Sequence, residues 1–250
     1  VQALESLDEI VETADVVMVA RGDLGLQMAL EDVPIAQKRI IATCNAIGRP
    51  VITATQMLES MVRTPRPTRA EASDVANAIL DGTDAVMLSG ETATGDYPVE
   101  TVSTMARISE KTEKLLDRWA WSDRRWITHG IEETDAVSRA AVQLANAISV
   151  EAIVTISASG MTPRLVSRYR PEDRIICATW LESTLRQMSV VWGVYGALVS
   201  HPNGTDDAMS SALDEFLDDG LLQSGDKVVI TAGLPAQEPG NTNLVHVRKV

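Results

Sequence analysis

Three short apolar segments in the first 95 residues each end abruptly in glycine and polar residues, and this pattern constrains the fold most strongly. The segments are 16–20, 51–54 and 85–88. Short apolar runs with such boundaries are typical of strands buried on both faces. Asp23 follows the first, Thr55 the second, and Ser89 with Glu91 the third. Parallel α/β folds place their chemistry at the carboxyl ends of strands, so we expect these side chains at one rim. Taken alone, Asp23 fits a turn-capping carboxylate equally well.

Helical patterns separate the apolar segments. Apolar residues recur at helical spacing over 31–47, 68–80 and 99–116, and an opening helix carries Leu4, Leu7, Ile10 and Val11. Consecutive β/α units favour a barrel over an open sheet, but three strands cannot close an eight-stranded barrel. We therefore expect a partial (β/α)8 TIM barrel, about its last three strands. Because the chain starts on a helix without Met, further β/α units are expected upstream of Val1.

Composition and charge limit the classes of partner that we expect for this chain. The net charge of −13 argues against a nucleic-acid backbone, and no apolar stretch approaches the ~20 residues of a membrane span. Cys44 and Cys177 lie in apolar surroundings and are expected as reduced core residues, which fits a cytoplasmic location. His129, His201 and His246 are scattered without zinc spacing.

A boundary is predicted where three tryptophans, Trp119, Trp121 and Trp126, interrupt the periodic pattern. We favour a seam between domains over a stacking platform for a ligand base. The expected domains are 1–117, a linker over 118–132, and 133–250. Strands are predicted in the second half, alternating with helices as in a doubly wound α/β domain, at 151–156, 174–178, 193–199, 227–231 and 244–247.

The first loop of this second domain joins a strand to a helix and is rich in hydroxyl groups. It contains Ser157, Ser159, Gly160 and Thr162. Free amides at a helix start attract phosphate, and hydroxyl groups add donors. Plain helix capping explains the same residues equally well.

Long motifs in both halves resemble the later part of the pyruvate kinase family. They lie in order along almost the whole chain, at 18–25, 54–61, 65–71, 73–78, 87–93, 95–98 and 240–244. The resemblance implies phosphoryl transfer from phosphoenolpyruvate to ADP, giving pyruvate and ATP, with Mg²⁺ (or Mn²⁺) and often K⁺.

The resemblance also implies roles for the first rim. Asp23 matches a metal ligand, and the amides of Gly22 and Asp23, with the Thr55 hydroxyl, match the groups that hold the substrate carboxylate. A short helical turn is expected to start near Leu24. Thr55 and Ser89 are candidates for the catalytic relay that protonates the enolate, with positioning roles preferred because a hydroxyl is a weak acid. Glu91 is expected to order this network.

The second half resembles the family's regulatory domain, whose Ser/Thr loop binds a phosphate of a sugar effector. Ser157, Ser159, Gly160 and Thr162 match that loop. Members that prefer a bisphosphate often carry Lys and Arg where this chain has Ala158 and Met161, so a sugar monophosphate effector, or none, is expected. The helix that contains 68–71 resembles one used at subunit contacts, which implies a homotetramer.

The resemblance places other essential groups before Val1: a second metal carboxylate, a lysine, an arginine and the K⁺ ligands. The chain alone is therefore expected to be inactive. Two alternatives stay open: a non-catalytic sugar-phosphate-binding regulatory module, and a carbon–carbon lyase of the pyruvate-handling barrel type.

Overall fold

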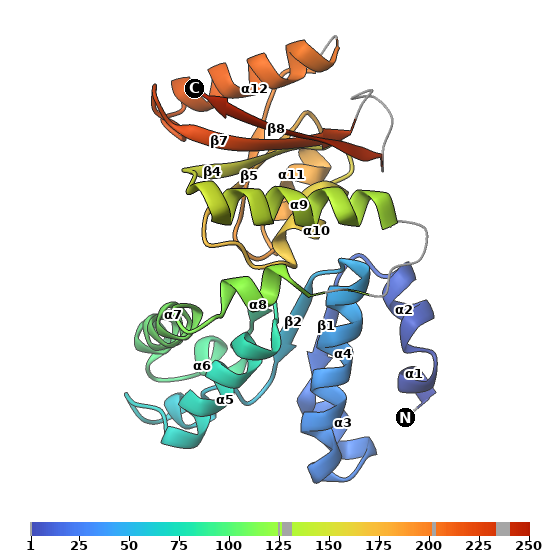
Figure 1. Cartoon of the computed structure of the whole chain (residues 1–250). Helices are drawn as coiled ribbons and strands as arrows, with labels where there is room; N and C mark the ends of the chain where they lie inside the picture. Colours follow the sequence, from blue (N-terminus) through green and yellow to red (C-terminus); the bar gives the residue numbers. More distant parts are fainter. Residues whose placement is uncertain (1, 125, 127–131, 202–203, 234–240) are drawn as a thin grey trace. The chain divides into compact units, whose positions relative to one another are not determined.

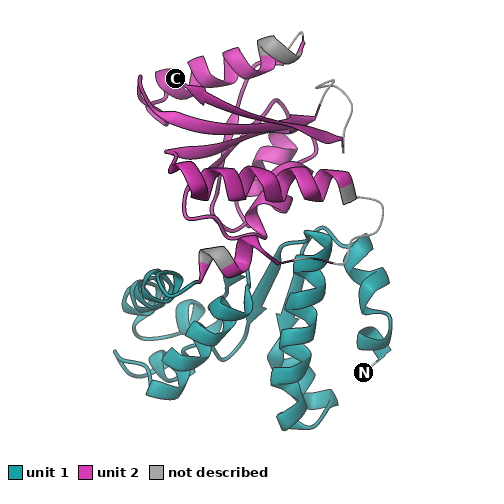
Figure 2. Cartoon of the chain, viewed as in Figure 1, with its two compact units in different colours: residues 1–116 teal, residues 117–250 magenta. Residues whose placement is uncertain are grey.

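The computed structural model describes residues 2–124, 126, 132–201, 204–233 and 241–250. The backbone divides into two compact units, Val1–Leu116 and Asp117–Val250 (Figure 2). Each unit has its own sheet.

The sheet of the first unit has three parallel strands in the order β1-β2-β3. Strands β1 and β2 lie side by side in Figure 1. Its strands are β1 (Val17–Ala20), β2 (Val51–Ala54) and β3 (Ala85–Val86). Ala20 lies opposite Ala54, and Thr53 lies opposite Val86, so all three strands end at the same edge. The prediction of consecutive β/α units from a partial barrel is confirmed.

Helices connect these strands as the apolar spacing predicted. The helical elements are α1 (Gln2–Glu5), α2 (Leu7–Thr13), α3 (Arg21–Gln27), η1 (Leu30–Asp32), α4 (Val33–Ile47), η2 (Glu59–Val62), α5 (Arg69–Asp81), α6 (Gly90–Ala93) and α7 (Pro98–Glu113). Gly48 ends α4 in the left-handed conformation. Thr68 and Glu71 form a capping box that starts α5.

Two details of the first sheet differ from expectation. Met18 on β1 is 49% exposed while its neighbour Val19 is fully buried, so β1 is not buried on both faces. The reason is that Val19 packs against Val11 and Ile41 of the helices, while Met18 points to the opposite face of the strand. The third strand pairs over only two residues, Ala85 and Val86, because the chain leaves the ladder before Ser89.

The second unit has a five-stranded sheet in the order β6-β5-β4-β7-β8, parallel except for the edge strand β8. Its strands are β4 (Ala152–Ile156), β5 (Arg174–Thr179), β6 (Val194–Leu198), β7 (Lys227–Gly233) and β8 (Thr242–Lys249). This is the predicted doubly wound arrangement. The chain runs from β4 to β5 and β6 on one side and then returns to β7 on the other, which makes the β4–β7 edge a topological switch point.

Helices cover both faces of this sheet (Figure 1). The helices described in this unit are α8 (Arg118–Ser122), α9 (Glu132–Ile148), α10 (Met161–Ser167), α11 (Glu182–Met188) and α12 (Thr205–Asp218). Val154 and Ile230 pack with Phe216 of α12. Their neighbours Ile153 and Val229 point to the opposite face and pack with Val142 of α9. No helix among the described residues is long and apolar enough to cross a membrane.

The tryptophan-rich segment contributes α8 to the second unit. Trp121 is 4% exposed, and the Arg124 guanidinium lies 3.5 Å from its ring centroid. Arg170 approaches the same ring at 5.7 Å. Cations stack favourably on tryptophan, so this buried ring holds the segment together and offers no open face to a ligand base. The ring centroids of Trp126 and Trp121 are 6.5 Å apart. The Trp119 side chain lies outside the described part of the structure.

Both cysteines are free and buried, as expected for core thiols. Cys44 lies on α4 in a buried cluster with Val11 and Val19, and Cys177 lies on β5. Burial raises the pKa of each thiol to about 12. Neither is a reactive thiolate at neutral pH.

Candidate functional site

A contact between the first two strands defines the rim of the first unit. The Gly22 amide donates a hydrogen bond to the Thr55 hydroxyl at 2.9 Å. Gly22 lies in the first turn of α3, which begins at Arg21 directly after β1. The expected start near Leu24 is wrong, because the chain turns helical as soon as β1 ends. Asp23 therefore lies inside the first turn of α3, where the helix dipole stabilises a negatively charged side chain.

Thr55 has an unusual backbone. Its φ is +68° and that of Gln56 is +52°, so two consecutive non-glycine residues occupy the left-handed region. The Thr55 hydroxyl also donates to the carbonyl of Ala54 at 2.7 Å. Such strain clusters at functional sites and is kept only where neighbours fix the conformation.

Arg21 binds the strained segment. Its Nε donates to the Ala54 carbonyl at 3.2 Å, and its Nη2 donates to the Thr55 carbonyl at 2.6 Å. Nη1 meets both carboxylate oxygens of Asp74 on α5, at 2.7 and 2.6 Å. The Arg21 side chain is only 12% exposed, which strengthens these charge-assisted bonds.

Glu91 connects the second and third strand ends. This side chain is 1% exposed. Its Oε1 accepts from the Leu58 amide at 3.2 Å, and its Oε2 accepts from the Ser89 amide at 2.8 Å. The buried carboxylate of Glu91 thus links Ser89, the residue before α6, to the segment from Thr55 to Leu58 that follows β2.

Asp23 lies at the same strand edge as Thr55, because Ala20 and Ala54 are partners in the ladder. Its side chain lines a pocket of about 250 Å³ together with apolar residues of α2 and β1, among them Leu7 and Met18. Asp23 is exposed, and a carboxylate of this kind suits a hard cation such as Mg²⁺ as one of several oxygen ligands. Within the described ranges, no three His, Cys, Asp or Glu side chains gather to hold a metal ion.

The hydroxyl-rich loop of the second unit lies at the carboxyl end of β4, beside the switch point. Ser157 Oγ accepts from the Gly160 amide at 3.0 Å, and Ser159 Oγ accepts from the Met161 amide at 3.4 Å. The Thr162 hydroxyl lies 2.7 Å from that of Thr242 at the start of β8. The loop is therefore closed by its own serines, and both threonines are buried.

Sequence reasoning gave no role to Arg21, Asp74 or Thr242. Arg21 and Asp74 could have been found from the sequence, because they lie in the two family motifs at 18–25 and 73–78. Thr242 is 80 residues from Thr162, and no local pattern links the two.

The fold and the rim define a protein that joins part of a parallel β/α barrel to a doubly wound α/β domain. Two family models match these parts: the pyruvate kinase barrel domain over residues 1–102 and the pyruvate kinase alpha/beta domain over residues 135–248. The chain belongs to the pyruvate kinase family. This assignment favours a kinase over the lyase alternative.

Individual relatives agree with the family models. A pyruvate kinase of Geobacillus stearothermophilus is 51% identical over 249 residues, which is 100% of this chain and 42% of that protein. One from Clostridium acetobutylicum is 44% identical over 249 residues, covering 100% of this chain and 53% of the relative. The crystal structure of a Cryptosporidium parvum pyruvate kinase matches with a TM-score of 0.88 at 36% identity, over 99% of this chain and 49% of that one. The chain thus spans about half the length of these relatives.

Proposed function

We propose that the first unit supplies part of the active site of a pyruvate kinase, which transfers the phosphoryl group of phosphoenolpyruvate to ADP. The Gly22–Thr55 contact carries this proposal, because it joins two of the three groups that the family resemblance assigns to the substrate carboxylate, the third being the Asp23 amide. The Gly22 amide donates directly to the Thr55 hydroxyl. An incoming carboxylate accepts from both, with the helix dipole of α3 favouring its charge.

The remaining rim residues orient this pair. Glu91 holds the Ser89 and Leu58 amides, so that the two hydroxyl-bearing loops keep a fixed spacing. Ser89 and Thr55 position the group or water that protonates the enolate. Asp23 contributes one carboxylate toward Mg²⁺ or Mn²⁺, and the family resemblance assigns the second metal carboxylate and the K⁺ ligands to other residues of the whole enzyme. When bound, a divalent metal stabilises the charge that develops on the phosphoryl and enolate oxygens.

A chimera tests the proposal. In the Geobacillus stearothermophilus pyruvate kinase, the 249-residue matching segment is replaced by this chain, and pyruvate formation is measured with phosphoenolpyruvate, ADP and Mg²⁺. We expect turnover by the chimera and none by the isolated chain. Asp23→Asn in the chimera is expected to lower kcat/KM by about 10²-fold, because it removes a metal ligand.

Asp15→Asn is the matched control, since Asp15 is also an exposed aspartate of the first unit. It is expected to leave kcat/KM unchanged. A folded chimera without turnover would contradict the proposal, as would equal effects of the two substitutions.

For the second unit we infer an effector site for a sugar monophosphate. The loop from Ser157 to Thr162 lies at the switch point of the sheet, where doubly wound folds bind ligands. Ser157 and Ser159 cap loop amides and can release them to a phosphate. Ala158 and Met161 supply no cation for a second phosphate. Binding without catalysis by this chain, as a regulatory module, is the second candidate function that this loop supports.

Calorimetry distinguishes these ligand classes. A hexose monophosphate is expected to bind more tightly than a hexose bisphosphate, and Ser159→Ala is expected to weaken binding by about tenfold. Ser183→Ala on α11, an exposed serine outside the loop, serves as control. Equal heats for the wild type and Ser159→Ala would refute the site.

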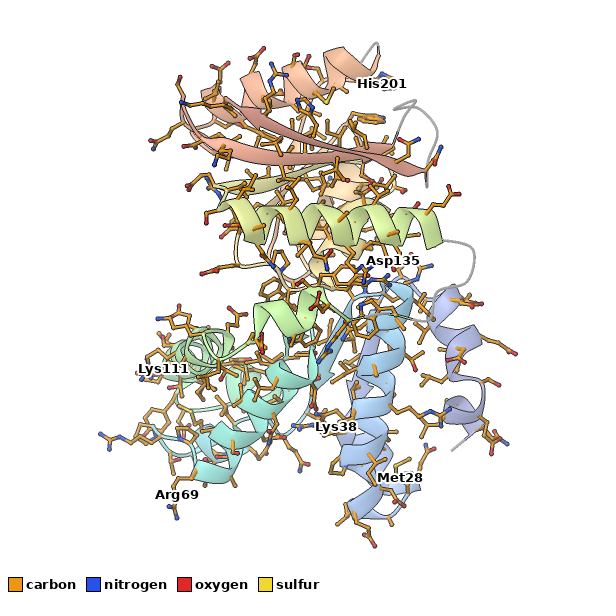
Figure 3. The ribbon with its side chains drawn as sticks, viewed as in Figure 1. Met28, Lys38, Arg69, Lys111, Asp135 and His201 are labelled. Atoms are coloured by element: carbon orange, nitrogen blue, oxygen red, sulfur yellow. The ribbon has the colours of Figure 1, made fainter. Side chains whose placement is uncertain are left out.

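The family resemblance also supports a homotetrameric assembly in the cytoplasm. Arg69 at the start of α5 is exposed and extends into solvent, as a subunit-contact residue requires (Figure 3). Arg69→Glu is expected to shift the chimera toward smaller assemblies in analytical ultracentrifugation, and an unchanged tetramer would exclude this contact.

A further inference from the structure

The left-handed pair Thr55–Gln56 needs an external support. Residues with a side chain rarely adopt positive φ, and threonine, with its branched Cβ, does so least readily. Thr55 and Gln56 adopt it in succession, at +68° and +52°. The conformation lets the Thr55 hydroxyl meet the Gly22 amide at the end of β1.

Arg21 provides bonds on both sides of Thr55. Its guanidinium donates to the carbonyl before Thr55 and to that of Thr55 itself, at 3.2 and 2.6 Å. Nη2 also lies 2.8 Å from the Met57 sulfur, just after the strained pair. Farther along, the buried Glu91 holds the Leu58 amide. The segment is thus fixed at both ends by charged side chains from neighbouring strand ends.

Asp74 on α5 fixes the direction of the Arg21 side chain. Both carboxylate oxygens lie within 2.7 Å of Nη1, while Nε and Nη2 remain directed at the Thr55 segment. This division of donors requires the planar fork of a guanidinium. A lysine ammonium at this position has one nitrogen and cannot reach all of these acceptors at once.

We propose that Arg21 is a positioning residue for the substrate site. It holds Thr55 in the left-handed conformation and thereby keeps the hydroxyl beside the Gly22 amide, ready for a substrate carboxylate. The inference deepens the proposed function and rests on it for the identity of the ligand. The arrangement of Arg21 and Thr55 is testable without catalysis.

Hydrogen exchange in the 250-residue chain tests the arrangement directly. The reporters are the Gly22 amide, which bonds to Thr55, and the Leu58 amide, which bonds to Glu91. Arg21→Lys is expected to accelerate exchange at Gly22 by about tenfold or more while leaving the core strands protected. Arg49→Gln is the matched control, because Arg49 also donates to backbone carbonyls, those of Val11 and Glu12, away from this segment.

Rescue by glycine separates positioning from a general loss of stability. Glycine adopts positive φ without strain, so Gln56→Gly, which relieves the second of the two strained residues, is expected to restore part of the protection at Gly22 when it is added to Arg21→Lys. If Arg21→Lys does not fold, Asp74→Asn weakens the anchor by removing its charge and one of its two acceptor oxygens while keeping the guanidinium, and Gln56→Gly must rescue that variant. Unchanged exchange in both Arg21→Lys and Asp74→Asn would overturn the proposal, and so would a folded variant that glycine does not rescue.

Kinetics of the chimera then test whether the position of Thr55 affects substrate binding. Arg21→Lys is expected to raise the KM for phosphoenolpyruvate by about tenfold, with recovery on adding Gln56→Gly, because small displacements of binding groups are costly. A chimera that never turns over while exchange responds as expected would reject the proposed function but keep the positioning role. If the chimera is active and Arg21→Lys changes neither its KM for phosphoenolpyruvate nor the exchange of the Gly22 amide, the positioning role alone is rejected.

Discussion

The hydroxyl of Thr55 accepts a hydrogen bond from the amide of Gly22, so residues 33 positions apart in the chain meet at one strand edge. The contact joins the ends of β1 and β2, and it predicts the effect of replacing Thr55. Thr55→Val keeps the shape of the side chain but removes the acceptor, whereas Thr55→Ser keeps the hydroxyl. We expect Thr55→Val to raise the KM for phosphoenolpyruvate in the chimera by roughly 10- to 100-fold, which corresponds to about 1–3 kcal/mol.

Steady-state kinetics measure this effect. Thr55→Ser is expected to remain within a few-fold of the wild type. Thr94→Val serves as the control, because the Thr94 hydroxyl, just after α6, donates to the Gly90 carbonyl and not to Gly22 or Thr55. A KM for Thr55→Val equal to that of Thr94→Val would remove Thr55 from the site.

The buried carboxylate of Glu91 predicts a stability effect. Glu91→Ala leaves the Leu58 and Ser89 amides without their acceptor, at a cost of about 2–5 kcal/mol. Glu91→Gln keeps one carbonyl acceptor and is expected to lose less. Chemical denaturation measures the difference, with the exposed Glu59→Gln as control. Similar midpoints for Glu91→Ala and Glu59→Gln would show that the two loops are held by other contacts.

Gly160 and Gly193 provide a matched pair of left-handed glycines. Their φ values are +74° and +68°. A Cβ at Gly160 would lie 2.6 Å from the Met188 methyl group and 3.2 Å from the Thr184 methyl group, while a Cβ at Gly193 meets nothing within 4 Å. Gly193→Ala therefore carries only the backbone cost of about 1 kcal/mol, and Gly160→Ala is expected to lose about 1–2 kcal/mol more. Thermal unfolding of the two variants checks this order, and a reversed order would contradict the close packing of Gly160 against Met188 and Thr184.

Asp173 predicts a pH-dependent stability. Its burial, with Glu172 and Glu151 nearby, raises its pKa from 3.8 to about 6. The folded state therefore binds this proton more tightly than the unfolded state, so stability falls as the pH rises from about 4 to about 6. Asp173→Asn removes this loss and is expected to stabilise the protein at pH 7 by about 1 kcal/mol, a figure reduced for partial solvent screening.

Urea titrations at pH 4 and pH 7 measure the Asp173 effect. The gain from Asp173→Asn should be present at pH 7 and absent at pH 4. Asp219→Asn, at an exposed position after α12, is the control. A gain of equal size at both pH values would show that charge is not the cause.

The raised thiol pKa values predict slow labelling. Both Cys44 and Cys177 are buried, with pKa values of about 12, so iodoacetamide at pH 8 is expected to modify the unfolded chain rapidly and the native chain only through opening. Mass spectrometry over time, with and without denaturant, provides the measurement. Rapid labelling of either cysteine in the native protein would contradict its burial.

Local sequence determined most of the elements of this protein. The helix from 33 to 47 follows from apolar spacing and ends at Gly48, where only a left-handed residue continues the chain. The order of strands and helices indicated the barrel part and the doubly wound part, because the period of hydrophobic residues is a local property. The motifs around Asp23, Thr55 and Ser89 indicated the family.

Tertiary structure decided what these residues contact. The bonds from Arg21 to the Thr55 segment and to Asp74 join positions 34 and 53 residues apart, and the Thr162–Thr242 contact spans 80. The positive φ of Thr55 is likewise absent from local preference, because threonine on its own avoids that region. Strain and long-range pairing arise only when separate segments pack together, so the sequence could name the rim residues but could not reveal how Arg21 holds them.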